Sequence, residues 1–200
     1  MVEVVGLREK KAQKVRDAIH DAMLTLTERD GYDAATLEMV ADRAEVGVAT
    51  IYRYFANKDA ILLDPIERSV GALANAFRTR PESEDVAVSL GWILHTTLDA
   101  GSEYLARLRR LRAQVDLAPG PRARLWDLIC QQRVLLEDAI AERSGQDQLW
   151  NAAAAHLTMM IITMAFDHER DSLDIATPAS YADEIIAMLH GSKNPLPVRE

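Results

Sequence analysis

Apolar residues recur at helical spacing along most of this chain, and that pattern restricts the possible folds more than any other feature. One example is the set Val15, Ala18, Ile19, Ala22 and Leu26, which follows the i, i+3, i+4, i+7 spacing of a single helix face. Gly31 then supplies a stop signal. No segment alternates for long between apolar and polar residues, as a half-buried strand would. The sequence therefore predicts an all-α fold of about nine helices.

Helix breakers divide the chain into three expected regions. Residues 1–57 contain one long helix followed by two short ones, and residues 58–80 are expected to form one longer connecting helix that contains Pro65. The polar stretch TRPESED then predicts a joint, and residues 81–200 are expected to form a bundle of longer helices. Thr177 followed by Pro178 predicts the start of the last helix, and Gly191 predicts its end.

The charge balance argues against a protein that coats nucleic acid through bulk charge. The formal net charge is −8 and the pI is near 5.2, whereas non-specific binding to polyanions comes mostly from excess Lys and Arg. Even the first 60 residues carry 9 Lys and Arg against 11 Asp and Glu. Any binding to nucleic acid must therefore depend on where the cations are placed.

The remaining composition predicts a soluble cytoplasmic protein. Cys130 is the single cysteine, which excludes an intrachain disulfide, and we expect it to be a small buried hydrophobe. The N-terminus lacks the order of charges and apolar residues that marks a signal peptide. The most apolar run, residues 152–166, is shorter than the roughly 20 residues that a membrane span needs.

The stretch TLEMVADRAEVGVATIYRYF, residues 36–55, divides into two short helices around a tight turn. Thr36 is expected to cap the first helix, and Ala44 to Gly47 form the turn. The second helix is expected from Val48 to Phe55, with Ile51 and Phe55 facing inward at i, i+4. Two short helices across such a turn are typical of a helix-turn-helix, whose second helix enters the DNA major groove.

Residues 26–62, LTERDGYDAATLEMVADRAEVGVATIYRYFANKDAIL, resemble the DNA-binding segment of TetR-type (tetracycline-repressor-like) transcriptional regulators. The resemblance covers about the first 65 residues and is carried by a combined signature rather than by one motif. Its members are Gly31-Tyr32, Thr36-Leu37, Val40-Ala41, Ala44, Val46, Thr50-Ile51-Tyr52, Tyr54-Phe55 and Asn57-Lys58-Asp59. The rest of the chain resembles the family only in length and helical character. The family implies an N-terminal DNA-binding domain and a C-terminal domain for effector binding and dimerisation.

The resemblance also implies roles for individual residues. The DNA-binding set is Thr36, Gly47, Val48, Ala49, Thr50, Tyr52, Arg53, Tyr54 and Lys58. Thr36, Tyr54 and Lys58 are expected to hold phosphates, and Ala49, Thr50 and Arg53 to face bases. Tyr52 is ambiguous, because it can also pack inward. The run LREKKAQKVR is expected to be a basic arm before the first helix; it suits phosphate or minor-groove contact, or it is simply a solvated face.

Three positions depart from the family pattern. Glu45 stands where the family usually has glycine, which costs roughly 1–2 kcal/mol if the turn needs a left-handed backbone. Gly47 replaces a common serine, so the second helix loses a side-chain cap. Val48 replaces a residue that is often polar and offers only an apolar contact, such as one to a thymine methyl group.

The larger C-terminal half is expected to hold a small-molecule effector and a dimer interface. Candidate pocket residues mix aromatic, polar and flexible apolar side chains: Trp92, His95, Thr96, Trp126, Met159 and Met160. The same residues at helical spacing are also compatible with ordinary core. Candidate dimer residues lie in the last two helices: Ala153, Leu157, Ile161, Ile185 and Leu189.

The prediction from sequence is thus a homodimeric, ligand-responsive regulator, a repressor released from a palindromic DNA operator by a small molecule. The alternative is a helical small-molecule sensor or interaction protein that has lost specific DNA binding, which Glu45, Gly47 and the acidic balance favour. No catalytic constellation, metal site or cofactor motif is recognisable, so an enzyme is not expected. Neither the effector nor the operator sequence follows from the residues.

Overall fold

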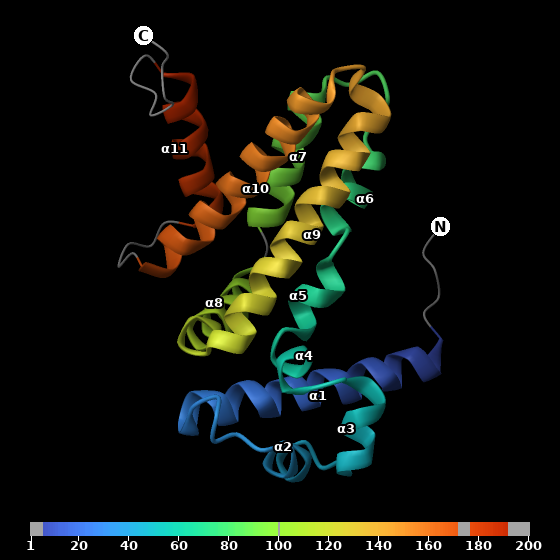
Figure 1. The fold of residues 1–200 in the computed structure, drawn as a ribbon, viewed down its shortest axis with the longest axis vertical. Coiled ribbons are helices and arrows are strands. Elements are labelled where there is room, and N and C mark those ends of the chain that lie inside the picture. Colours follow the sequence, from blue (N-terminus) through green and yellow to red (C-terminus); the bar gives the residue numbers. More distant parts are fainter. Residues whose placement is uncertain (1–5, 100, 172–176, 192–200) are drawn as a thin grey trace. The chain divides into compact units, whose positions relative to one another are not determined.

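The computed structural model describes residues 6–99, 101–171 and 177–191. Those ranges contain eleven α-helices and no strand, which confirms the all-α prediction (Figure 1). The helices are α1 (Leu7–Asp30), α2 (Leu37–Arg43), α3 (Val48–Tyr54), α4 (Lys58–Leu62), α5 (Asp64–Ser69), α6 (Ala72–Arg78), α7 (Val86–Leu98), α8 (Ser102–Leu117), α9 (Pro119–Ser144), α10 (Gln148–Asp171) and α11 (Pro178–His190).

The chain forms two compact units. The N-terminal unit consists of the residues up to 69 together with 110–128, and the C-terminal unit consists of 70–109 together with the residues from 129 onward. Residues 58–69 and 110–128, which the sequence prediction placed outside the DNA-binding domain, thus pack with the first 57 residues. Helices α8 and α9 each contribute residues to both units.

The core of the N-terminal unit is built around α1, which packs against α2 and α4. Short helices α2 and α3 lie on one side of α1 (Figure 1). Ile19, Met23 and Leu26 of α1 are buried, and their spacing is the helical period that the sequence showed. Each fully buried side chain of this size contributes about 1.5–3 kcal/mol through removal from water.

The single helix expected over residues 58–80 is three helices in the structure. Pro65 has no N–H and cannot bond the carbonyl of Ile61 four residues earlier. The buried ring of His20 forms a hydrogen bond with that carbonyl instead, with Nδ1 3.0 Å from the Ile61 oxygen. Gly71 makes the second break with a φ of 85°, a left-handed conformation that favours glycine. These two breaks account for eleven helices where the sequence predicted about nine.

The C-terminal unit has its own apolar core, in which α10 packs against α7 and α11 and α6 packs against α7. Its most deeply buried members include Phe77, Ile93, Leu98, Leu136 and Ile140. The start of α11 agrees with the prediction, because the Thr177 hydroxyl accepts the Ser180 N–H at 3.3 Å and Pro178 follows directly. Gly191 caps the other end of α11.

Two expectations about burial were wrong or incomplete. Cys130 is exposed, because it lies on the outward side of α9 between Trp126 and Val134, which are also exposed. Residues 148–167 of α10 are long and apolar enough to cross a membrane by length and composition alone, whereas the sequence argument counted only 152–166. This is weak evidence for a span, since the core helix of a soluble protein passes the same test.

Candidate nucleic-acid interface

The turn between α2 and α3 has the left-handed backbone that the family resemblance implied. Glu45 has a φ of 55° and is the one non-glycine residue with positive φ in the described part of the chain. The Val46 N–H donates to the Ala41 carbonyl at 3.0 Å and closes the turn. A side chain in this region costs roughly 1–2 kcal/mol relative to glycine. The turn is therefore formed despite its residue, which indicates that the surrounding helices determine it.

The two helices begin with different caps. The Thr36 hydroxyl accepts the Met39 N–H at 3.2 Å, as expected for an N-cap, and retains its own proton for another acceptor. Gly47 takes the extended N-cap conformation and forms no side-chain bond at the start of α3. The second helix therefore keeps an unassisted N-terminus, as the glycine predicted.

Helix α3 separates its residues into a buried face and an exposed face. Ile51 and Phe55 are 1% and 4% exposed, which confirms that both anchor the helix. Gly47, Ala49 and Arg53 are exposed, and Val48, Thr50 and Tyr54 are half-buried. Tyr52 is 60% exposed, so it does not pack inward. The residues expected to meet DNA thus lie on the side of α3 that its own core leaves open.

Lys58 lies at the start of α4 and is directed toward its own chain. Its ammonium group donates to the Tyr32 carbonyl and lies 4.2 Å from the centre of the Tyr32 ring. The Tyr32 hydroxyl donates to Asp59, and burial together with this carboxylate raises the pKa of Tyr32. These contacts tie the connection between α1 and α2 to α4. The phosphate contact expected of Lys58 stays a prediction.

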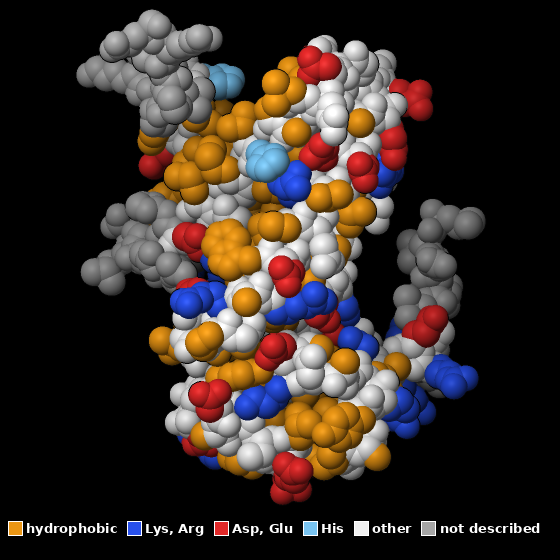
Figure 2. Space-filling model, in the orientation of Figure 1, with side chains coloured by type: hydrophobic (Ala, Val, Ile, Leu, Met, Phe, Trp, Pro, Cys, Tyr) orange, Lys and Arg blue, Asp and Glu red, His pale blue; other side chains and the backbone are white. Residues whose placement is uncertain are grey.

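The basic run at the N-terminus is helical, so the expectation of an arm before the first helix was wrong. Helix α1 begins at Leu7, and the carboxylate of Glu9 accepts the Gly6 N–H at 2.9 Å. This hydrogen bond caps the helix ahead of the cations. Figure 2 shows Lys and Arg side chains gathered over this part of α1. The cations are Arg8, Lys10, Lys11, Lys14 and Arg16.

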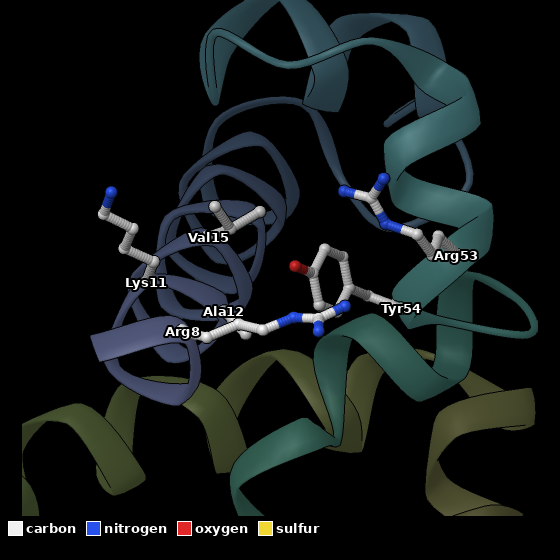
Figure 3. A pocket seen from close by; sticks show the side chains of 6 residues that line it. All are labelled: Arg8, Lys11, Ala12, Val15, Arg53 and Tyr54. Carbon is white, nitrogen blue, oxygen red and sulfur yellow. The ribbon is translucent and has the colours of Figure 1, made fainter. Parts of the chain in front are cut away.

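A groove of about 820 Å³ lies between the first part of α1 and the end of α3 (Figure 3). Its lining, which we call the α1–α3 groove, consists of Arg8, Lys11, Ala12, Val15, Arg53 and Tyr54. Arg53 lies over the Tyr54 ring, with its guanidinium carbon 5.1 Å from the ring centre. The sequence argument missed this groove, although residues 8, 11, 12 and 15 have the spacing of one helix face.

Arg16 connects three elements of the N-terminal unit. Its guanidinium group pairs with Asp64 of α5 and donates to the Tyr54 carbonyl at the end of α3 at 3.4 Å. It also lies 4.7 Å from the centre of the Phe55 ring. Asp64 is fully buried and forms a second ion pair with Arg68 at 3.0 Å. Sequence reasoning grouped Arg16 with the DNA-facing cations, whereas its contacts are structural.

The residues expected to line an effector pocket have different environments. Met159 belongs to the core, and Met160 packs partly buried against it. Trp92 is exposed beneath Arg80, whose guanidinium carbon lies 4.6 Å from the indole centre. His95, Thr96 and Trp126 are exposed as well. The Nε2 atom of His95 lies 3.4 Å from Asp183, and the Thr96 hydroxyl donates to the Trp92 carbonyl. Trp126 belongs to the N-terminal unit and not to the unit that holds the other five. The pocket role of these six residues stays a prediction.

The residues expected at a dimer interface also divide into two groups. Ala153 and Leu157 are exposed on α10, and Ile185 and Leu189 of α11 are half-buried. Ile161 is 6% exposed and packs in the core of its own unit, so it is not available to a second chain. Trp150 and Met164 of α10 and Met188 of α11 are further large apolar side chains that are exposed. Figure 2 shows hydrophobic side chains gathered over α10.

Two short helices joined across a left-handed turn, with a solvent-facing second helix, define the N-terminal unit as a helix-turn-helix domain of the DNA-binding class. Residues 19–64 match the family model described as "Bacterial regulatory proteins, tetR family". Residues 19–64, which contain the helix-turn-helix, therefore belong to the DNA-binding segment that defines this family.

Two similar proteins agree with that assignment. The HTH-type transcriptional regulator TcmR of Streptomyces glaucescens is 35% identical over 80 residues, which are 40% of this chain and 35% of TcmR. The HTH-type transcriptional repressor KstR of Rhodococcus jostii is 45% identical over 58 residues, which are 28% of this chain and 27% of KstR. The chain therefore matches only about a third of these relatives' lengths.

The fold similarity extends beyond the N-terminal unit. The structure of Thermus thermophilus FadR, a TetR-family transcriptional repressor in complex with lauroyl-CoA, has a TM-score of 0.57 to this chain at 15% sequence identity. The superposition covers 92% of this chain and 96% of that chain. The second unit is thus also similar in fold to a known regulator of the family.

Proposed function

We propose that this chain is a ligand-responsive DNA-binding transcriptional regulator, a homodimeric repressor that a small molecule releases from a palindromic operator. The observation that carries the proposal is the open face of α3, on which Ala49 and Arg53 are exposed and Thr50 is half-buried, while Ile51 and Phe55 hold the helix in the core. A recognition helix needs this division, because its base-reading side chains must stay free of the protein's own contacts.

The contacts to DNA follow from the chemistry of each exposed residue. Ala49 and Thr50, near the start of α3, face base edges, and Val48 offers a methyl surface to thymine. The Thr36 hydroxyl keeps a proton that it can donate to a phosphate oxygen, because it already accepts the Met39 N–H. Tyr52 adds an exposed phenol beside the same surface. Lys58 binds phosphate only after its ammonium group leaves the Tyr32 carbonyl.

A second copy of the chain is the proposed partner of the exposed side of α10. The exposed residues Trp150, Ala153, Leu157 and Met164, with half-buried Met160 among them, follow alternating steps of three and four residues, the spacing of a helix–helix seam. Burying this stripe against its symmetry mate produces a two-fold interface. A two-fold dimer places two α3 helices on half-sites about 34–36 Å apart, as a palindromic operator requires.

The effector is proposed to bind in the C-terminal unit. The FadR repressor with lauroyl-CoA has the same fold, which supports a ligand site in this architecture without identifying the ligand. An effector that prefers one conformation of the dimer weakens operator binding by the same factor by which DNA weakens effector binding. A cytoplasmic location follows from a partner that is chromosomal DNA.

The decisive experiment is selection of duplexes from a random-sequence pool, followed by gel-shift titration of the best sequence. We expect a palindromic consensus, and Thr50→Ala is expected to reduce the preference for it by about 1–3 kcal/mol for each base that the hydroxyl reads. Glu38→Ala, an exposed substitution outside the interface set, is the matched control. Recovery of no consensus, with no shift at low salt, would favour the rival, a helical sensor without specific DNA binding.

A further inference from the structure

The α1–α3 groove carries three cations whose charges are not compensated by any described residue. Among the described residues, neither Arg8, Lys11 nor Arg53 has a carboxylate within ion-pair distance. Nearby Arg16 differs, because it pairs with Asp64. Uncompensated cations that line one groove repel one another and favour an anion between them.

The lining of the groove combines this charge with apolar surface. Ala12 and Val15 contribute aliphatic side chains from α1, and Tyr54 contributes a ring and a hydroxyl from α3. Figure 3 shows Arg8 reaching from α1, and Arg53 from α3, toward the Tyr54 ring. Such a surface suits a chain of anions joined by apolar units, which describes the phosphates and deoxyriboses of a DNA strand. A lone small anion would leave most of the apolar floor in water.

The position of the groove supports the same occupant. Arg53 and Tyr54 are the last residues of α3, whose first residues face the bases in the proposed complex. The strand that borders the major groove must pass beside a helix inserted there, so its phosphates come within reach of residues that flank the helix.

We infer that the α1–α3 groove binds the sugar–phosphate backbone of DNA beside the bases that α3 reads, with Arg8, Lys11, Arg53 and Tyr54 as one phosphate-binding set. The inference rests on the proposed DNA-binding function and assigns it a second contact surface. It also changes the role of Arg53, which the family resemblance assigned to bases. The stacking of Arg53 over Tyr54 holds its guanidinium group at the groove instead.

The test is the salt dependence of DNA binding. Each phosphate neutralised by a cation contributes about −0.9 to the slope of log K against log salt concentration. The double variant Arg8→Ala/Lys11→Ala is therefore expected to make the slope less steep by about 1.8, on both a random-sequence duplex and the selected operator. The ratio of their affinities should stay unchanged, because phosphate contacts carry no sequence information.

The matched control is Lys10→Ala/Lys14→Ala, which removes the same charge from the same helix at exposed positions outside the groove. Its effect on the slope should be less than half that of the groove pair. Arg8→Lys/Lys11→Arg keeps the charge and should retain the wild-type slope, which separates removal of the cations from a misfolded α1. Arg53→Ala should reduce the slope by about 0.9 without altering base preference.

Three results would overturn the inference. Equal slopes for the groove pair and the control pair would show that α1 acts only through diffuse charge. If Arg53→Ala lowers the preference for one base pair of the operator by tenfold or more, Arg53 contacts a base and not the backbone. Failure of the wild type to bind either duplex would reject the proposed function itself, and the inference with it, whereas the first two results leave DNA binding intact.

Discussion

Two arginine-rich hollows in the described part of the chain, one in each unit, give their cations opposite surroundings. In the C-terminal unit, a hollow of about 560 Å³ is lined by Phe77, Arg78, Arg80, Glu82, Ala139, Glu142 and Arg143; we call it the α6–α9 hollow. Arg78 donates two hydrogen bonds to Glu142, and Arg80 donates two to Glu84. The cations of the α1–α3 groove have no such carboxylates among the described residues.

The difference indicates which arginines build the protein and which are available to a partner. Around the α6–α9 hollow, Arg143 donates to Ser89 at 2.7 Å and to the Pro81 carbonyl at 3.2 Å, and it lies 4.1 Å from the centre of the Phe77 ring. Hydrogen bonds from Arg80 and then from Ser89 lower the pKa of Glu84 to about 2. Net charge is thus a poor guide to function here. The two sites differ in whether their arginines form ion pairs with the described carboxylates of the chain.

The largest test concerns Arg16, the paired cation that lies closest in sequence to the groove. Asp64→Asn is expected to lower the free energy of unfolding by about 3 kcal/mol, because it removes a buried charge from between two arginines. Urea denaturation followed by circular dichroism measures this. Asp17→Asn is the control, since Asp17 pairs with Arg68 at the surface and should cost less than about 1 kcal/mol. Equal losses would show that the Asp64 network is no more structural than a surface pair.

A crossed pair of variants compares the two hollows directly. Arg143→Ala should cost about 1–2 kcal/mol of unfolding free energy through the hydrogen bonds that it removes, and leave the salt dependence of DNA binding unchanged. Arg53→Ala should make the salt dependence of DNA binding less steep and change the free energy of unfolding by less than about 0.5 kcal/mol. Thermal melts and salt titrations of both proteins give the four values. Destabilisation by Arg53→Ala as large as that by Arg143→Ala would remove the distinction between structural and available arginines.

The turn between α2 and α3 offers a smaller and favourable change. Glu45→Gly should stabilise the N-terminal unit by up to about 1 kcal/mol, because relief of the left-handed conformation exceeds the extra freedom glycine gives the unfolded chain. The midpoint of thermal unfolding measures the gain. Glu45→Ala keeps a Cβ atom and should therefore not raise the midpoint of thermal unfolding. A similar rise in both variants would show that the effect comes from removal of the carboxylate.

The smallest effect concerns pH. The folded pKa of Glu84 lies near 2, below its ordinary value of 4.5, so its stabilising contribution is complete above pH 4.5 and is lost as pH falls toward 2. Glu84→Gln should therefore unfold at a lower temperature than wild type at neutral pH, and the two midpoints should converge on acidification. Glu82→Gln removes another carboxylate of the same hollow, one without an ion pair to a described residue, and should follow wild type. Parallel curves for Glu84→Gln and wild type would contradict the assignment.

Local chemistry was predictable from sequence where one residue decides the conformation. The caps at Thr36 and Thr177 and the stop at Gly31 depend on the preferences of single positions. The inward pair Ile51 and Phe55 followed from helical spacing, which the burial confirms. Together these features were enough to place the exposed face of α3.

The predictions from sequence were wrong where contacts between distant parts of the chain determine the structure. The break at Pro65 is stabilised by His20, which lies 45 residues earlier in the sequence. Burial of Ile161 and exposure of Cys130 depend on which helices cover α10 and α9, and helical spacing does not determine that. The α1–α3 groove was missed because its two sides are separated by more than thirty residues, although each side was visible in the sequence alone.

The capped start of α1 at Gly6 has a consequence for the timing of DNA recognition. Arg8, Lys10 and Lys11 lie in the first turns of α1, where the partial positive charge of the helix dipole opposes them and only Glu9 offsets it. The free protein therefore keeps these turns locally frustrated, and a polyanion in the groove relieves the repulsion. Backbone amides at the start of α1 should exchange with deuterium more slowly once DNA is bound, so that ordering of α1 and docking on DNA occur as one coupled event.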